Sequence, residues 1–584
     1  MTLWAPSQNP AGLPRFLSMT LVIFLLSLWS VTNALATQPQ RPLGESLPAE
    51  QGSFEYFEDV LVETDLGEID ATSVNSWSGE APAQTLQDLL DALNVMQDEY
   101  FCLWLGTWPT SIDWTATVLG THVGAALSSF TSSYGPGVSS GEQSQNFSFI
   151  ALENTVNQFF SHLNTFYFGE NAFGLRNQAY DDMLWVVLDW LENIKFQDLH
   201  TDCHYAPSNA SNASNSSSGS TWYGTQFRDS AAHRARIFYE LASVGWDKTL
   251  CDGGMIWNPS LVPYKNAITN ELYISASIAM YLYFPGDPID APFMTTNKDP
   301  ASSGHNPIYL KAAVDGYKWL KESKMTGLYG LYADGFHIKN WRSSSDPGTR
   351  KCDVLNTMVF TYNQGVVLSG LRGLWLATGS QNYLRDGHEL IHKVLQATGW
   401  PHTSSTKWAG LGRGGVLEEA CESHATCSQD GQTFKGIFFH HLAEFCRPLR
   451  PQEERFLAGD TRRPVEDEKW EQVSSRHLNR CRSYGPWIEH NARAALMTRD
   501  DDGKFGMWWG LPFSSTIADG IVGSSTLPEG AVDYRNGEID AEALTSGVPR
   551  DFNDRGRGRT VETQSGGVAV LRALFQWQTS DALS

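Results

Sequence analysis

The chain contains 584 residues, with 42 lysine plus arginine against 65 aspartate plus glutamate, which gives a formal net charge of −23. This acidity argues against nucleic acid as a partner, because phosphate binding requires a basic surface. A hydrophobic content of 41 % with only 18 % charged residues excludes an intrinsically disordered chain and predicts a large folded core.

The first 36 residues are predicted to be a targeting segment. Residues 16–36 form an uncharged, mostly apolar run that follows Arg15 and ends in Ala34-Leu35-Ala36, a pattern that signal peptidase cleaves. The run is also long enough to span a bilayer, so an uncleaved signal anchor stays open as the alternative. Both interpretations export the rest of the chain. We therefore expect a secreted or cell-wall-associated protein, membrane-bound only if residues 16–36 are retained.

Cysteine usage agrees with export. An even number of cysteines in an exported chain predicts disulfides, and this chain has eight: Cys102, Cys203, Cys251, Cys352, Cys421, Cys427, Cys446 and Cys481. Cys421 and Cys427 are close enough in sequence for a local bridge, whereas the other pairings stay open. No CxxC or paired His-Cys spacing indicates zinc.

Four N-glycosylation sequons occur, at Asn146, Asn209, Asn212 and Asn215. The last three lie in a stretch rich in serine and asparagine, residues 208–220, which is typical of a solvated, glycosylated loop. An unmodified polar loop is the alternative, because sequons alone are weak signals.

After the targeting segment, residues 37–83 are polar and acidic with little periodicity, and we predict an N-terminal arm there. From residue 84 to residue 584, helical spacing recurs and predicts one helical domain. The predicted helices cover residues 86–96, 149–166, 180–194, 227–244, 267–284, 308–321, 364–377, 383–398, 433–445, 473–498 and 563–578.

About a dozen helices without a sheet predict an all-α fold, either a solenoid or a closed toroid of helical hairpins. No fixed repeat period is present, which argues against a regular solenoid. The segment Met183–Leu188 is apolar all round, and such a helix must be buried on every side, as an inner helix of a double ring would be. Long polar insertions near 135–146, 205–222, 403–416 and 448–472 are expected at the rim.

Asp181 and Asp182 open that apolar helix. Aspartate is common at helix starts, where the helix dipole favours negative charge, so the pair has a purely structural explanation. No lysine or arginine lies between Arg176 and Lys195, however, and adjacent like charges in an apolar setting raise one pKa. One carboxyl group then stays protonated while the other is ionised. Glycoside hydrolysis requires this division between a general acid and a nucleophile or base.

Other polar side chains interrupt the helical segments at Tyr264-Lys265-Asn266, Asn270-Glu271 and Tyr362-Asn363-Gln364. Amide and tyrosine side chains suit the neutral hydroxyls of a sugar, since they donate and accept hydrogen bonds, although helix capping by asparagine is the alternative.

The aromatic and histidine pairs have two interpretations each. Trp257 and Trp508-Trp509 are suited to stacking on a sugar face or to core packing. For His440-His441 we favour packing or a surface role over metal binding, because no third ligand occurs at a useful spacing.

Taken together, these motifs resemble glycoside hydrolase family 76, the α-1,6-mannanases and related fungal cell-wall enzymes. The resemblance runs from about residue 84 to residue 578. Six segments carry it in the family's order: AYDDMLW (179–185), CDGGMIWNP (251–259), YKNAITNELYISAS (264–277), TYNQGVVLSGL (361–371), the Cys421/Cys427 segment leading into QTFKGIFFHHLAEF (432–445), and DDGKFGMWWG (501–510).

The resemblance implies an (α/α)6 barrel of six helical hairpins over residues 84–584. It also implies retaining hydrolysis of internal α-1,6-mannosidic bonds, with Asp181 as nucleophile and Asp182 as acid/base, by a protein that is expected to be a monomer and to need no metal or organic cofactor. By position, the implied substrate contacts are Asn266, Tyr362, Asn363, Gln364, Lys435 and Trp509.

Three alternatives stay open at this point. A cell-wall transglycosidase acting on mannose-containing or GPI-core glycans would use the same covalent intermediate. A non-catalytic mannan-binding wall protein would be free to lose either carboxylate, and the intact pair argues against it. Another (α/α)6 enzyme, a lyase or a glucosidase, has little support, because lyases acting on uronates usually require a basic cleft.

Overall fold

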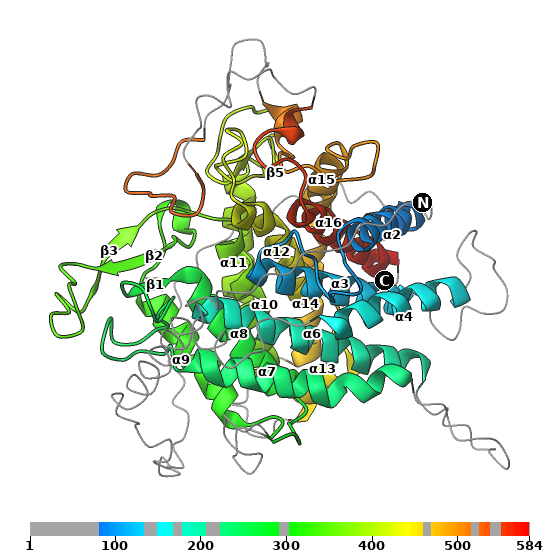
Figure 1. Ribbon diagram of the computed structural model, residues 1–584, viewed down its shortest axis with the longest axis horizontal. Coiled ribbons are helices and arrows are strands. Elements are labelled where there is room, and N and C mark those ends of the chain that lie inside the picture. Colours follow the sequence, from blue (N-terminus) through cyan, green and yellow to red (C-terminus); the bar gives the residue numbers. More distant parts are fainter. Residues whose placement is uncertain are drawn as a thin grey trace, which may run out of the picture. The chain divides into compact units, whose positions relative to one another are not determined.

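The computed structural model describes residues 81–133, 149–166, 178–205, 222–290, 303–459, 469–514, 525–537 and 551–582, all within one compact unit, residues 70–584 (Figure 1). Most of these residues are helical. The helices are α2 (Ala81–Glu99), α3 (Asp113–Ser133), α4 (Phe149–Thr165), α6 (Tyr180–His204), α7 (Arg228–Ser243), α8 (Ala267–Tyr283), α9 (Pro307–Glu322), α10 (Val366–Thr378), α11 (Gln381–Ala397), α12 (Gln429–Cys446), α13 (Pro451–Gly459), α14 (Trp470–Arg482), α15 (Gly485–Leu496) and α16 (Val561–Ala582).

Several predicted features lie outside the described residues. These are the targeting segment 1–36, the four sequon asparagines Asn146, Asn209, Asn212 and Asn215, and nearly all of the arm predicted at 37–83, although α2 already begins at Ala81. Within the described part of the chain, no helix is both long and apolar enough to cross a bilayer.

Six helices form a closed inner ring. α3 packs against α6, α6 against α8, α8 against α10, α10 against α12, α12 against α16, and α16 returns to α3. The remaining helices lie outside this ring: α4 packs on α3, α7 on α6, α9 on α8, α11 on α10, α14 on α12, and both α2 and α15 on α16. Inner and outer helices alternate along the chain for most of its length, so the predicted (α/α)6 barrel is confirmed.

Inner and outer helices differ in how much of their surface is buried. In α12 every side chain from Gly431 to Cys446 is buried, charged residues included, as expected for a helix surrounded by other helices. The outer helix α11 instead buries Leu384, Leu390, Ile391 and Val394 on one face and leaves the opposite face polar. The sequence pattern thus distinguishes helices covered on all sides from amphipathic outer helices.

Four features of the chain differ from the expectation. Helix α3 was not predicted, because its 21 residues are rich in Thr, Ser and Gly, which are weak helix formers. The segment 473–498 is two helices, α14 and α15, and α15 begins with a proline in its first turn. The insertion 448–472 contains α13, and within the insertion 403–416 residues 411–416 are buried rather than at a polar rim.

The expectation of no sheet was also wrong. Strands β1 (Tyr264–Asn266), β2 (Gly335–Ile338) and β3 (Cys352–Asn356) form a small antiparallel sheet in the order β1-β2-β3, with Asn266 opposite Gly335 and Gly335 opposite Asn356. A side chain at Gly335 would meet the Cα of Asn266 at 2.6 Å, so the strands approach this closely only with glycine there. A second hairpin joins β4 (Gly412–Arg413) to β5 (Val416–Leu417).

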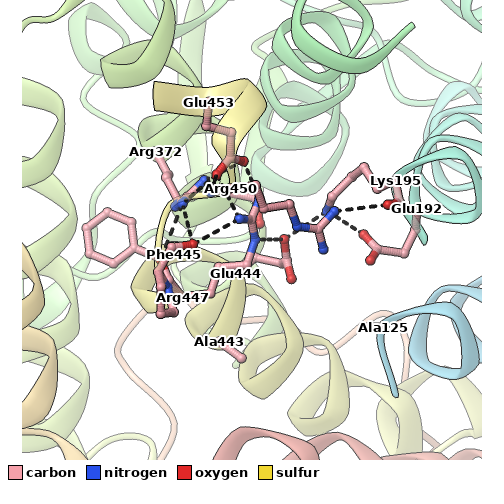
Figure 2. Close-up of polar contacts among 12 residues, drawn as sticks. Ala125, Glu192, Lys195, Arg372, Ala443, Glu444, Phe445, Arg447, Arg450 and Glu453 are labelled. Atoms are coloured by element: carbon pink, nitrogen blue, oxygen red, sulfur yellow. Dashed lines mark hydrogen bonds and ion pairs between the residues drawn. The ribbon is translucent and has the colours of Figure 1, made fainter. Parts of the chain in front are cut away.

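A buried network of charged side chains occupies the inner ring toward the ends of α6 and α12 (Figure 2). Glu444 accepts hydrogen bonds from Lys195 at 2.8 Å and from Arg572 at 2.7 Å, and so joins α6, α12 and α16. Glu453 accepts from Arg372 at 3.0 Å and from Arg447. A cavity of about 60 Å³ lies beside these groups. Each buried acid therefore has cationic partners, without which its desolvation would be strongly destabilising.

Three disulfides connect described residues: Cys251–Cys352, Cys421–Cys427 and Cys446–Cys481. The predicted local bridge between Cys421 and Cys427 is confirmed, whereas Cys102 and Cys203 are unpaired thiols. Cys251–Cys352 connects the loop before β1 to the edge strand β3.

Loop length predicts which bridge contributes most to stability. The Cys251–Cys352 bridge spans 101 residues and Cys421–Cys427 spans 6, so the chain-entropy model assigns them roughly 4–5 and 2 kcal/mol. We expect the Cys251→Ser/Cys352→Ser variant to lose more free energy of unfolding in urea than Cys421→Ser/Cys427→Ser. An equal or larger loss for the short bridge would contradict this ranking.

Candidate active site

The N-terminal ends of the inner helices gather at one end of the ring, and each of four first turns carries acidic residues. Asp113 begins α3, Asp181 and Asp182 lie in α6, Asp430 in α12 and Glu562 in α16. Hydrogen bonds join these ends directly. Trp114 Nε1 donates to Asp430 at 2.7 Å, and Thr115 Oγ1 donates to Glu562 at 2.8 Å. Because helix N-termini favour negative charge, this end of the barrel concentrates carboxylates.

Asp181 and Asp182 lie at the centre of this end. The N–H of Tyr180 donates to the Trp257 carbonyl at 2.9 Å, which fixes the start of α6 against the loop before β1. Asp181 is 5 % exposed, whereas Asp182 is partly open to solvent. The backbone N–H of Asp182 donates to Asp181 Oδ1 at 3.2 Å. The two carboxyl groups thus share one turn but differ in access.

Their environments separate their protonation states. Burial raises the pKa of Asp181 to about 6, although Arg535 and hydrogen bonds from the backbone and Trp257 act in the opposite direction. Burial also raises the pKa of Asp182 well above its ordinary value, and the charges of Asp181, Asp113 and Asp430 add to that shift. Both shifts favour the protonated form, and the neighbouring carboxylates favour it further at Asp182, so the two groups lose their protons at different pH. Burial contributes more to these pKa shifts than like-charge repulsion does.

Arg535 was not found by sequence reasoning. It lies in a described segment, residues 525–537, far along the chain from the aspartate pair. Its guanidinium carbon lies 5.8 Å from the centre of the Trp257 ring and 5.6 Å from that of Tyr362. Its charge acts on Asp181, Asp334 and Asp430. No lysine or arginine lies near the aspartate pair in the sequence, as expected, but in the folded protein Arg535 acts on both carboxyl groups.

Three predicted substrate contacts are buried polar residues without protein partners. Among described atoms, the side-chain amides of Asn266 and Asn363 and the hydroxyl of Tyr362 have no hydrogen-bond partner. The Tyr362 ring stacks on Phe434 with centroids 3.8 Å apart. Burial raises the pKa of its hydroxyl well above the ordinary value, and the charge of Asp181 adds to that shift. Because an unpaired buried polar group is costly, these groups are available for water or a ligand.

The other three predicted contacts are bonded into the framework. Gln364 exchanges hydrogen bonds with the backbone of Tyr332 at 2.8 and 2.9 Å. Lys435 forms an ion pair with Glu422 at 2.8 Å and lies 4.1 Å from the centre of the Trp509 ring. These contacts favour supporting roles for Gln364, Lys435 and Trp509. Of the predicted stacking residues, Trp257 is partly exposed beside Asp181, whereas Trp508 and Trp509 are buried.

The histidines do not assemble a metal site among the described residues. His440 and His441 are buried, and burial lowers the pKa of both rings, which keeps them neutral. His388, His477 and Cys481 have ligand atoms within 4.8 Å of one another. Cys481, however, is bonded to Cys446 and offers no thiolate, and His388 is hydrogen-bonded to His477 at 2.9 Å.

Comparison with known proteins supports the family resemblance. The sequence model described as Glycosyl hydrolase family 76 matches residues 231–458. The resemblance to glycoside hydrolase family 76 is confirmed. The matched residues begin after α6, so the assignment of Asp181 and Asp182 to the family 76 site depends on their geometry and on the motif at 179–185.

The curated relatives carry one activity name. Mannan endo-1,6-alpha-mannosidase DCW1 of Candida glabrata is 26 % identical over 213 residues, 35 % of this chain and 37 % of that protein. The protein of the same name from Saccharomyces cerevisiae is 24 % identical over 217 residues, 36 % of this chain and 38 % of that protein. The chain thus spans little more than a third of the length of the curated relatives it matches.

Among solved structures, the GH76A alpha-1,6-mannanase from Salegentibacter sp. HEL1_6 is similar, with a TM-score of 0.46 and 16 % identity. The comparison covers 84 % of this chain and 98 % of that one.

The raised pKa of Asp181 predicts that the free energy of unfolding depends on pH. Between the ordinary value of 3.8 and about 6, the folded protein retains a proton that the unfolded chain has lost, so stability falls as pH rises through this window. Asp181→Asn removes that loss of stability, about 3 kcal/mol at most. We expect the variant to have a higher free energy of unfolding than the wild type at pH 7 and an equal one at pH 4.

Urea unfolding at both pH values measures this difference, with Asp501→Asn, at an exposed carboxylate, as the control. Loss of stability at pH 7 in Asp181→Asn would mean that the carboxylate stabilises the fold instead.

Proposed function

We propose that this protein is a retaining glycoside hydrolase that cleaves internal α-1,6-mannosidic bonds of mannan. The observation that carries the proposal is the pair of adjacent carboxyl groups in the first turn of α6, Asp181 buried and Asp182 partly open to solvent. Burial raises the pKa of both, which supports a division into acid and nucleophile. The family match and the activity name of the curated relatives support the substrate class. The three disulfides support an exported protein.

In this proposal, Asp181 is the nucleophile and Asp182 the general acid. The ionised carboxylate of Asp181 attacks the anomeric carbon while Asp182 gives its proton to the departing glycosidic oxygen, so that the C–O bond breaks and a mannosyl ester forms on Asp181. Asp182, now ionised, takes a proton from water, and the resulting hydroxide displaces the carboxylate of Asp181. Each cycle restores both protonation states, and the product retains the anomeric configuration.

Substrate recognition requires neutral hydrogen-bonding groups, because mannose carries no charge. Asn266, Asn363 and Tyr362 supply unpaired amide and hydroxyl groups at the same end of the barrel. The partly exposed indole of Trp257 offers a face for a sugar ring beside Asp181. The chemistry assigned to these residues needs no cofactor.

The proposed reaction can be tested directly. Incubation with linear α-1,6-mannan should release short manno-oligosaccharides from the earliest time points, with the α-anomer first in proton NMR. We expect Asp181→Asn and Asp182→Asn each to reduce turnover by roughly 10²–10⁴-fold, as for loss of a positioned acid or base. Asp501→Asn serves as the matched control.

Each other outcome selects a different function. Near-normal activity in either active-site variant would remove that residue from the mechanism. Larger products formed in the presence of an acceptor glycan would identify a transglycosidase, since a sugar hydroxyl can replace water at the same ester. Mannan binding by a folded protein without cleavage would identify a non-catalytic wall protein.

The proposed roles also predict how kcat/KM depends on pH. Because Asp181 must be ionised, kcat/KM should rise with pH through about 6, the pKa of that carboxyl group. Because Asp182 must be protonated, kcat/KM should fall again at higher pH. The bell-shaped profile is measured on mannan from pH 4 to pH 9. In Asp182→Asn the residual activity should lack the alkaline limb; a retained alkaline limb would assign it to another group.

A further inference from the structure

Residues 529–537, here called the strap, join two distant parts of the barrel mouth. At one end the strap pairs with the end of β3: the N–H of Val532 donates to Asn356 Oδ1 at 2.8 Å, and Asn356 Nδ2 donates to the Val532 carbonyl at 2.9 Å. Thr357 Oγ1 adds a hydrogen bond to the Glu529 carbonyl at 2.6 Å. This segment is the orange trace beside β2 and β3 in Figure 1.

At its other end the strap is fixed to the start of α12. Asn536 Oδ1 accepts from the backbone N–H of Ser428, the N-cap residue of α12, at 2.8 Å. The N–H of Gly537 donates to the Thr426 carbonyl at 3.2 Å. The strap therefore has defined anchors on both sides of the aspartate pair.

Arg535 lies between these anchors in a turn organised by Asp533. Asp533 Oδ1 accepts from the backbone N–H groups of Arg535 and Asn536 at 3.1 and 3.0 Å. The guanidinium is placed near the rings of Trp257 and Tyr362, and Trp257 also donates a hydrogen bond to Asp181. Arginine stacks on aromatic faces and keeps its charge when buried, which suits a fixed cation in this position.

The surroundings of Arg535 are acidic. Among described groups it is the cation that acts on both Asp181 and Asp182. Asp334 lies close enough for Arg535 to act on its pKa, and it accepts hydrogen bonds from Tyr264 at 2.6 Å and Asn356 at 3.2 Å. The titratable and charged groups that act on the aspartate pair or on Arg535 include Asp113 on α3, Tyr362 before α10, Asp430 on α12 and Asp334 before β2. Asp533, in the strap, acts in turn on Asp334.

We propose that Arg535, held by the strap beside the rings of Trp257 and Tyr362, is a positioning residue whose charge acts on the aspartate pair in the chemical step. This inference rests on the proposed function. An uncharged mannose chain needs no cation for binding, so the charge of Arg535 is directed at the carboxylates. Arg535 is thus assigned to the chemical step and not to affinity.

The test compares Arg535→Met with Arg535→Lys. For the methionine variant we expect kcat to fall about 10²-fold, the scale for losing one preorganised charged group, with KM unchanged within about 3-fold. The acidic limb of the pH profile should move upward by about one pH unit, since loss of a nearby opposite charge raises the pKa of Asp181. In Arg535→Lys, the acidic limb should return to its wild-type pH, because the lysine restores the positive charge. Arg557→Met, at an exposed arginine, is the matched control.

An unchanged acidic limb in Arg535→Met, or a tenfold rise in KM with kcat preserved, would overturn the proposal. If the methionine variant does not fold, Asn536→Ala provides the second test, because it releases the α12 anchor and keeps the charge. It should lower kcat more than it raises KM and should move the same limb upward. A loss in Asn536→Ala that appears only in KM would also overturn the proposal.

An activity-independent measurement separates this proposal from the proposed function. The free energy of unfolding should fall with rising pH over a window that extends to higher pH in Arg535→Met than in the wild type, and this difference between the two should disappear when Asp181→Asn is added to both. Should the wild type cleave no mannan while this shift occurs, the proposed substrate is wrong and the role of Arg535 stands. If the wild type cleaves mannan and the window does not shift, the proposed function stands and the role of Arg535 is wrong.

Discussion

Closure of the inner ring is the constraint on which the rest of the structure depends. When α16 packs on α3, all six inner helices become covered on every side, and polar groups must either pair inside the barrel or collect at its two ends. The ends differ electrostatically. Helix N-termini gather carboxylates at one end, and about 14 residues further along α6 and α12, roughly 21 Å away, Lys195 and Glu444 belong to a paired ionic network.

The same closure accounts for the chemistry that the acidic end can support. Burial is the first cause of the raised pKa of both Asp181 and Asp182, and a solvated surface turn would not provide it. The helices supply the aspartates, the sheet and the loop before it supply Asp334 and Trp257, and the strap supplies Arg535. Residues distant in sequence therefore act on two neighbouring carboxyl groups, which gives chemically identical side chains different protonation states.

The sequence predicted those parts of the fold that depend on local pattern. The apolar run after Asp182 indicated an inner helix, and the spacing in residues 383–398 indicated an outer one. The sequence pattern did not reveal α3, which is rich in the weak helix formers Thr, Ser and Gly and is buried on nearly all sides. It also did not reveal β1, because three residues are too few to show a strand pattern. Arg535 could not be predicted for another reason. It is placed near Asp181 by hydrogen bonds that the strap makes to Asn356 and Ser428, and no sequence spacing predicts these contacts.

The ionic network also imposes an order on biosynthesis. Glu444 lies on α12, but one of its partners, Arg572, lies on α16, the last helix described. Until residues 561–582 have emerged from the ribosome, the ring is open between α12 and α3, and a carboxylate destined for the interior lacks one of its cations. The barrel is therefore completed only after translation has reached its final helix. A nascent chain must remain soluble as an open array of hairpins until then, so its exposed inner faces are natural binding surfaces for chaperones.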